Sequence, residues 1–274
     1  MATVNTNVGA MIALQSLNKT QRELAVVQNR INTGLQVASA KDNGALFAIA
    51  QNMRSEVAGL GAVSQSLNRA ASTGDVAIAA GEAISDLLIE MKEKALASSD
   101  SSLDANSRAA LNEDFSALRD QIQTIVANAS FNGVNLVDGS VTDIQALANG
   151  DGSTRLTISG EDLSLAGAII TLATNATIAA QGTASTAIAT VETSLNNVNQ
   201  ALARLGTGIK SLEIHSIFVS KLSDSLHAGI GNLVDADLAH ESARLQSLQV
   251  KQQLGTQALS IANQAPQMLL GLFR

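Results

Sequence analysis

Apolar residues recur at alternating steps of four and three near both ends of the chain. The stripe near the N-terminus contains Ala10, Leu14, Leu17, Gln21, Leu24, Gln28, Ile31 and Leu35. The stripe near the C-terminus contains Val234, Leu238, Glu241, Leu245, Leu248, Gln252, Gly255, Leu259 and Ala262. A repeat of 3.5 residues is typical of a helix that buries one seam against a second helix. Both ends are therefore predicted to be long helices that need a partner.

Similar stripes predict three more helices between the ends. Small and turn-forming residues at 33–44 predict a bend, after which a long helix ends at the serine-rich run 98–102. A helix from about Asp104 should stop before the turn Phe131-Asn132-Gly133. Another begins after Ser185. Its register slips by one position near Val234, so we expect a boundary around Gly229 and Gly231.

The middle of the chain differs from these helical stretches. Charged residues are sparse between 134 and 183, and the alternation in 155–159 after the turn 149–152 predicts a β-hairpin. The predicted fold is mainly α: an elongated antiparallel helical bundle with paired N- and C-terminal coiled-coil helices and a small β-hairpin insertion. The stripes alone fit either a closed bundle or a chain that packs further copies around its ends. Polar members such as Gln21 and Gln28 favour the second reading.

Composition agrees with thin helical bundles. Of 274 residues 46% are hydrophobic but only 2% aromatic, and a single proline leaves long helices uninterrupted. Cysteine is absent, which excludes disulfides and thiol chemistry. The net charge of -7 argues against a nucleic-acid partner. The N-terminus lacks the basic start and continuous apolar run of a secretory signal, so no cleaved signal is predicted. No apolar run is long enough for membrane insertion.

Candidate chemistry is scarce. His215, His227 and His240 match no metal-ligand spacing, and Gly206–Ser211 lacks the ending of a phosphate loop. The acidic residues near the C-terminal stripe, Asp224, Asp235, Asp237 and Glu241, read as solvated helix faces. We assign no catalytic residue, cofactor or metal ligand, and expect no enzyme.

Three ordered blocks of the sequence resemble the bacterial flagellin family, whose members are self-assembling subunits of the flagellar filament. The N-terminal block comprises Leu17-Asn18-Lys19-Thr20-Gln21, Arg30-Ile31-Asn32-Thr33-Gly34-Leu35, Ser39-Ala40-Lys41-Asp42 and Leu46-Phe47-Ala48-Ile49-Ala50. The second is Phe131-Asn132-Gly133-Val134-Asn135-Leu136. The third runs from Ala258 to Gln267, with Leu269 and Leu270 behind it. A hook-filament junction protein of the flagellin-like family is the alternative.

The resemblance implies an architecture and partners. Residues 1–33 and 234–274 would form paired helices of an inner layer, residues 34–139 and 185–233 a helical shaft, and residues 140–184 a hairpin and outer loop. The implied partners are identical or sister flagellins, the flagellar export apparatus, a secretion chaperone, and the filament cap and junction proteins. The implied location is the extracellular filament, reached by export of the unfolded chain. The assembly seam would contain Leu14, Leu17, Gln21, Leu24, Gln28, Ile31, Val234, Leu238, Leu245, Leu248, Gln252 and Leu259.

Two further expectations follow from the resemblance. Some flagellins carry O-linked sugars, for which the candidates here are Thr142, Ser153, Thr154, Thr171, Thr174, Thr177 and Thr183; satisfied turns explain these residues equally well. Flagellins sensed by the animal Toll-like flagellin receptor carry a Gln-Arg-x-Arg-Glu-Leu segment. The matching stretch here is Met91-Lys92-Glu93-Lys94-Ala95-Leu96. Lysine lacks the planar bidentate donors of arginine, so we expect weak or no activation.

Overall fold

The computed structural model describes residues 6–271, and the side chains of residues 6–264. The first five and last three residues of the predicted terminal segments lie outside the described residues. The chain divides into two compact units. Unit 1 comprises residues 1–55 and 225–274, and unit 2 comprises residues 56–224.

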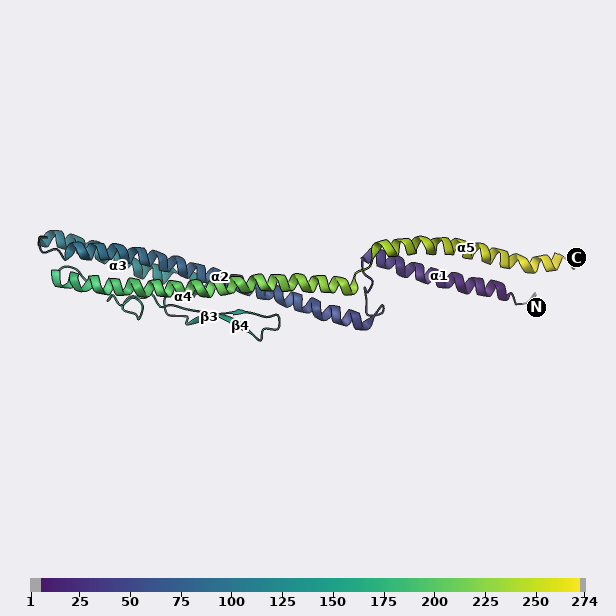
Figure 1. Ribbon diagram of the computed structural model, residues 1–274, viewed down its shortest axis with the longest axis horizontal. Helices are drawn as coiled ribbons and strands as arrows, with labels where there is room; N and C mark the ends of the chain where they lie inside the picture. Colours follow the sequence, from purple (N-terminus) through teal and green to yellow (C-terminus); the bar gives the residue numbers. More distant parts are fainter. Residues whose placement is uncertain (1–5, 272–274) are drawn as a thin grey trace. The chain divides into compact units, whose positions relative to one another are not determined.

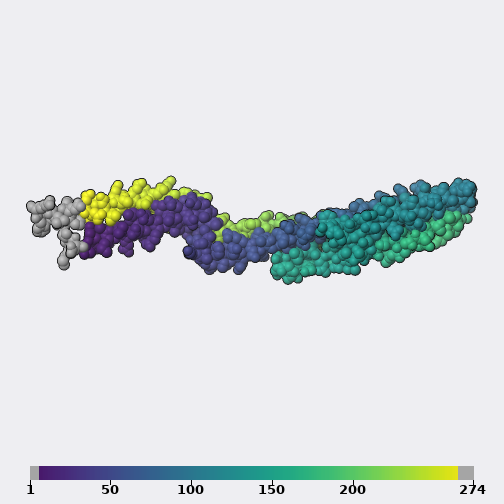
Figure 2. All heavy atoms as spheres, turned by 180° about the vertical axis from the view of Figure 1, so that it is seen from behind, coloured from purple at the N-terminus to yellow at the C-terminus, as the bar shows by residue number. Residues whose placement is uncertain are grey.

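Unit 1 is built from α1 (Val8–Thr33), the start of α2 (Gly44–Ser98), the end of α4 (Gln181–Val234) and α5 (Leu238–Gly271). The side chain of Asn7 accepts a hydrogen bond from the Ala10 amide and begins α1. Gly34 ends it in the left-handed conformation, with φ of 71°, and donates its N–H to the Arg30 carbonyl. Helices α1 and α5 lie side by side (Figures 1 and 2).

Unit 2 contains the rest of α2 and α4 together with α3 (Ala105–Asn128). The Asp104 carboxylate accepts hydrogen bonds from the amides of Asn106 and Ser107 at 2.8 and 3.0 Å and begins α3. Hydrogen bonds from Ser107 lower the pKa of Asp104 below its usual range. The predicted start near Asp104 is confirmed.

Two antiparallel hairpins follow α3. Strands β1 (Ser130–Phe131) and β2 (Val134–Asn135) enclose the Asn132-Gly133 turn, where both residues have positive φ. Strands β3 (Asp143–Leu147) and β4 (Arg155–Ser159) pair with Ile144 opposite Ile158. The predicted mainly α fold with a small β-hairpin is confirmed.

The core of unit 2 lies between its helices and the segment after the hairpin. Its largest fully buried side chains are Leu67, Ile84, Leu88, Met91, Phe115, Ile122, Leu136, Leu163, Ile170, Leu172, Ile178 and Leu205. Gly74 and Gly81 allow α2 and α4 to approach closely, since a Cβ there would lie 2.7 Å from Ile209 Cγ1 and 2.6 Å from Leu202 Cδ2. Gly74 lies beside Ile209 and Gly81 beside Leu202, so α2 and α4 run antiparallel.

Side-chain hydrogen bonds hold the segment 160–180 against the helices. Arg204 donates to both carboxylate oxygens of the buried Glu161, each at 2.6 Å. This bidentate bond raises the pKa of the Arg204 guanidinium. At the far end of the segment, the Ile178 amide donates to the Asn112 side chain, and the Ile178 carbonyl accepts from the Ser98 hydroxyl. The segment is therefore an ordered part of unit 2.

Two predicted boundaries need correction. Helix α4 begins at Gln181, not after Ser185, because Thr183 exchanges hydrogen bonds with the backbone of Ala180 and caps the helix earlier. Gly229 and Gly231 lie inside α4, and the break falls after Val234. Contacts divide the chain at 55/56 and 224/225. The division into an inner layer and a shaft at 33/34 and 233/234 stays a prediction.

Candidate functional site

The terminal helices α1 and α5 pair in an antiparallel arrangement. Asn7 Nδ2 donates to the Ala262 carbonyl at 2.7 Å at one end of the pair. At the other end, Arg30 Nη1 lies 2.9 Å from Glu241 Oε1. Between them, a Cβ on Gly255 would lie 3.3 Å from Leu17 Cδ1. The predicted pairing of the two ends is therefore present within one chain.

The buried core of this pair is small. It consists of Leu24, Val27 and Leu248, with Ile31 and Leu245 packed against it. Leu17 is also buried, 8% exposed. Fully burying one such side chain stabilises by roughly 1.5 to 3 kcal/mol, and ordering each residue costs about 1 to 2 kcal/mol. A core of this size gives two helices of this length little stability of their own.

The N-terminal seam differs from the predicted one at every second position. Leu17 and Leu24 are buried and Ile31 is partly buried, as expected. Leu14, 48% exposed, Gln21 and Gln28 instead lie on the exposed flank. Their places are taken by the preceding residues, Ala13, Thr20 and Val27. The buried stripe therefore steps three, four, three, and contains no glutamine.

The C-terminal seam is close to the predicted one. Leu248 is buried, and Leu245, Gln252 and Leu259 are partly buried. Leu238 is an exception, because it is 49% exposed at the start of α5. Val234 is a second exception, because it is buried as the last residue of α4 and does not belong to α5.

An ion pair between Arg30 and Glu241 joins the two helices. The Glu241 side chain is 7% exposed and that of Arg30 is 24% exposed. Arg30 Nε and Glu241 Oε2 are buried without a hydrogen-bond partner in the described part of the chain. A buried pair that is only half satisfied fixes alignment more than it stabilises. Glu241 is thus a buried member of the seam, contrary to its reading as part of a solvated face.

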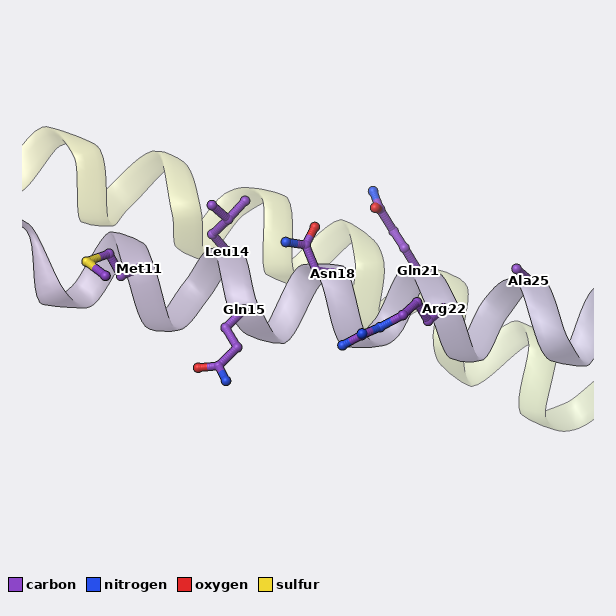
Figure 3. A pocket seen from close by; sticks show the side chains of 7 residues that line it. All are labelled: Met11, Leu14, Gln15, Asn18, Gln21, Arg22 and Ala25. Atoms are coloured by element: carbon purple, nitrogen blue, oxygen red, sulfur yellow. The ribbon is translucent and has the colours of Figure 1, made fainter.

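A groove lined by exposed side chains runs along one face of α1. Figure 3 shows this face, a shallow groove of about 690 Å³. The groove is lined by Met11, Leu14, Gln15, Asn18, Gln21, Arg22 and Ala25. Val8, Met11 and Ile12 on α1, and Val250, Leu254 and Ile261 on α5, are each more than half exposed. Apolar side chains clustered on a helix pair this thin indicate a surface that other molecules cover.

The connections that follow α1 and precede α5 bond to each other. The amides of Gln36 and Val37 donate to the Val234 carbonyl, and the Ala236 amide donates to the Gly34 carbonyl. Asp237 caps α5 by accepting from the amides of Ala239 and His240. Asp235 and Asp237 therefore belong to the connection, and their reading as helix-face residues is wrong.

The candidate glycosylation residues differ in how their hydroxyl groups are used. Six of them take part in hydrogen bonds: Thr142, Ser153, Thr154, Thr171, Thr177 and Thr183. Thr174 is exposed, and its hydroxyl makes no hydrogen bond to any described residue. Thr171, Thr177 and Thr183 also line a groove of about 430 Å³ beside the start of α4.

The other candidate groups take structural roles. His215 Nε2 lies 2.6 Å from the Ala148 carbonyl, which links α4 to the hairpin. Gly206–Ser211 lies within α4, so it forms no phosphate loop. Among residues 6–271, no group of three or more histidines and carboxylates is placed to hold a metal ion. No helix in this range is long and apolar enough to cross a membrane.

The stretch that matches the receptor segment lies on α2. Lys92 Nζ is 3.4 Å from Glu192 Oε2, and Lys94 Nζ is 3.1 Å from Asp114 Oδ2. Met91 and Ala95 are fully buried. Both lysines are therefore engaged with neighbouring helices of the same chain.

Two solved structures share this fold. The structure of a putative flagellar hook-associated protein from Vibrio parahaemolyticus aligns with a TM-score of 0.59 and 13% identity. It covers 71% of this chain and 100% of that one. Bacillus cereus flagellin aligns with a TM-score of 0.50 and 22% identity, over 56% of this chain and 87% of that one. At these identities the likeness shows the fold alone.

Sequence comparisons are more specific. The model of the bacterial flagellin N-terminal helical region matches residues 4–142, and that of the C-terminal helical region matches residues 188–273. Flagellin FljK of Caulobacter vibrioides is 56% identical over 99% of this chain and 98% of its own length. The flagellin of Brucella melitensis is 36% identical over the full length of both chains. The chain therefore belongs to the bacterial flagellin family, the structural subunits of flagellar filaments.

Proposed function

We propose that this chain polymerises through its terminal helix pair into a hollow helical filament outside the cell, which serves swimming motility. The observation that carries the proposal is the thin α1–α5 pair, which leaves apolar side chains exposed on both helices. Neighbouring copies that cover these side chains would supply the stability that the pair lacks. Residues 1–33 and 234–274 would then line the inner layer, with the rest of the chain outside them.

Sister flagellins are proposed as partners beside identical copies. Caulobacter vibrioides has several flagellins similar to this chain, among them FljK, FljM and FljO at 56, 55 and 54% identity. Copies this similar would present nearly the same terminal helices and could enter one filament. The export apparatus, a secretion chaperone, and the cap and junction proteins are proposed from family membership. Export of the unfolded chain is proposed on the same ground.

A truncation tests the assembly role. Removal of residues 234–274 deletes α5 and the Val234 carbonyl that accepts from Gln36 and Val37. The truncated chain is expected to stay helical by circular dichroism and to remain in the supernatant after seeding with filament fragments. Full-length monomer treated in parallel should sediment as filaments. Seeded growth of the truncated chain would contradict the proposal.

A glycan, where present, is proposed to be attached at Thr174. Its hydroxyl is exposed and makes no hydrogen bond to a described residue, whereas sugars on the other six candidates would displace existing hydrogen bonds. Intact mass spectrometry of filament-derived protein tests this directly. An added hexose-type mass that the Thr174→Ala variant lacks would support it, and a mass equal to that of the sequence would reject it.

Weak recognition by the animal Toll-like flagellin receptor is also proposed. Lys92 and Lys94 offer point charges in place of planar guanidinium groups, and both form ion pairs within the chain. A receptor reporter assay should give little response to the monomer. A response equal to that of a flagellin with both arginines would overturn this proposal.

A further inference from the structure

Two exposed faces of unit 2 are complementary, and we propose that they bind each other between neighbouring copies of this chain. The acidic face on α2 consists of Asp75, Glu82, Asp86, Ile89, Glu90, Glu93 and Leu96. The lysine face on α4 consists of Ala203, Thr207, Lys210, Ile214, Ile217, Phe218 and Lys221. The inference rests on the proposed polymerisation, and it names the surfaces through which unit 2 takes part.

The acidic face points away from the helices packed against α2. Its members are all exposed and recur at helical spacing, so they share one side of α2. Gly74, Gly81 and Lys92 face α4, and Lys94 faces α3. The five carboxylates form no ion pair with any described residue. Negative charge is therefore concentrated on this face without a partner.

The lysine face is apolar in the middle and basic at its ends. Ile214, Ile217 and Phe218 are each more than half exposed. Lys221 forms no ion pair with a described residue, and Lys210 lies 3.8 Å from Glu213, with both side chains mostly exposed. A shallow groove of about 600 Å³ runs along this face from Ala203 to Ile214. A cluster of three large apolar side chains on the exposed side of a helix indicates a contact surface.

The two faces match in spacing. Glu82 and Glu93 are eleven residues apart, as are Lys210 and Lys221, which corresponds to about 16 Å along each helix. Ile89 lies between the glutamates, and Ile214 lies between the lysines. Opposite charges would therefore meet at both ends of an apolar centre.

One displacement aligns all three pairs. Helices α2 and α4 are antiparallel, with Gly74 level with Ile209 and Gly81 level with Leu202. A parallel copy shifted along the helices by about 20 residues, or about 30 Å, brings Glu82 level with Lys221 and Glu93 level with Lys210. The same shift brings Ile89 level with Ile214. The three pairings share one stagger because the spacings on the two helices are equal.

This geometry favours an open assembly. The faces lie on different helices, so the contact is heterologous and each bound copy keeps one free acidic face and one free lysine face. Such contacts repeat along a line and do not close into a dimer when the displacement is a translation. A second copy of this chain is therefore the occupant that the two faces fit.

Charge reversal tests the pairing in the full-length chain. Glu82→Lys with Glu93→Lys reverses the acidic face, and Lys210→Glu with Lys221→Glu reverses the lysine face. Each double variant should raise the critical concentration for sedimentable filaments about tenfold at low salt, because two attractive pairs become repulsive. The two variants change net charge in opposite directions, so a general charge effect would not raise the critical concentration in both. Glu113→Lys, at an exposed site on α3 outside both faces, is the matched positional control.

Combination of the variants provides the decisive measurement. A chain with all four substitutions restores opposite charges at every contact and should return within about threefold of the original critical concentration. An equimolar mixture of the two double variants should also polymerise better than either alone. Failure of the fourfold variant to recover, or double variants that polymerise normally, would overturn the pairing and leave the proposed function intact. If unsubstituted chain forms no filaments, the proposed function itself falls.

Discussion

Unit 1 and unit 2 use the same kind of helix but differ in how much they bury. The largest side chains with less than 2% exposure, among the described residues, all belong to unit 2. The α1–α5 pair of unit 1 has three buried apolar residues in its cluster and leaves others exposed on both helices. Unit 2 can hold its fold through its own core. The α1–α5 pair of unit 1 exposes apolar side chains that other molecules can cover.

Polar groups show the same contrast. In unit 2 the buried Glu161 carboxylate is satisfied by both arms of Arg204. In unit 1 the buried Glu241 has one oxygen bonded to Arg30 and one without a hydrogen-bond partner among the described residues. Unsatisfied buried groups cost free energy, so a chain designed only for monomer stability would avoid them. The difference suggests that specificity of alignment matters more than stability in the terminal pair.

The largest expected effect comes from truncating the core of each unit in turn. Phe115→Ala in unit 2 should destabilise by about 3 to 5 kcal/mol, because Phe115 is completely buried. Leu24→Ala in unit 1 should leave the main thermal transition nearly in place, while amide exchange of α1 and α5 accelerates and seeded elongation slows.

Circular dichroism melting and hydrogen exchange on the same samples separate these outcomes. Leu24→Ala and Phe115→Ala act on different units, so their effects should add. A main transition lowered equally by both substitutions would show that the two units unfold as one, and would remove the basis of the comparison.

A smaller effect tests which residues of α1 face α5. Val27→Ala should weaken the pair by about 2 kcal/mol, because the side chain is buried at 1% exposure. Gln28→Ala, one position along, should change it by less than about 0.5 kcal/mol, because Gln28 is exposed. Amide exchange rates in α5 measure both. Equal effects would restore the seam that the sequence first suggested.

The seam also shows what sequence reasoning could and could not supply. Heptad spacing found both terminal helices, and it placed Leu17, Leu24 and Ile31 in the contact. The intermediate positions can lie either three or four residues on, and the predicted stripe took the four-residue step to Leu14, Gln21 and Gln28. In the structure the steps lead to Ala13, Thr20 and Val27, and the placement of α5 that selects them is not encoded in α1 itself.

The start of α3 near Asp104 was predicted from the apolar stripe that follows it, and the structure adds the cap that Asp104 forms. The Asp235–Asp237 connection was missed because two acidic residues were assumed to lie on a continuous helix, whereas Asp237 caps a new one. A capping aspartate followed by Glu241 in the first turn was the available signal. The backbone hydrogen bonds between the two connections join residues about 200 positions apart, so no local pattern could have predicted them.

The smallest expected effect is a pH response that differs between the units. Asp42 accepts hydrogen bonds from the amides of Ala38 and Ser39 and from the Ser39 hydroxyl. The backbone hydrogen bond from Ser39 is the main reason that the pKa of Asp42 lies below its usual range. Because the folded pKa is lowered, its contribution is complete above the usual pKa of an aspartate and is lost as pH falls through the lowered value.

Asp104 provides the matched group in unit 2, since its pKa is lowered by comparable bonds from Ser107. Amide protection at Ala38 and Ser39 should fall in acid and should not do so in Asp42→Asn. Because unit 1 has a thin core, the loosening at Asp42 should extend into α1, whereas acid loosening at Asp104 should stay within the first turn of α3. Hydrogen exchange measured across this pH range, with Asp104→Asn as control, follows both sites. Loosening that spreads through α3 but not α1 would reverse the assignment of the weaker unit.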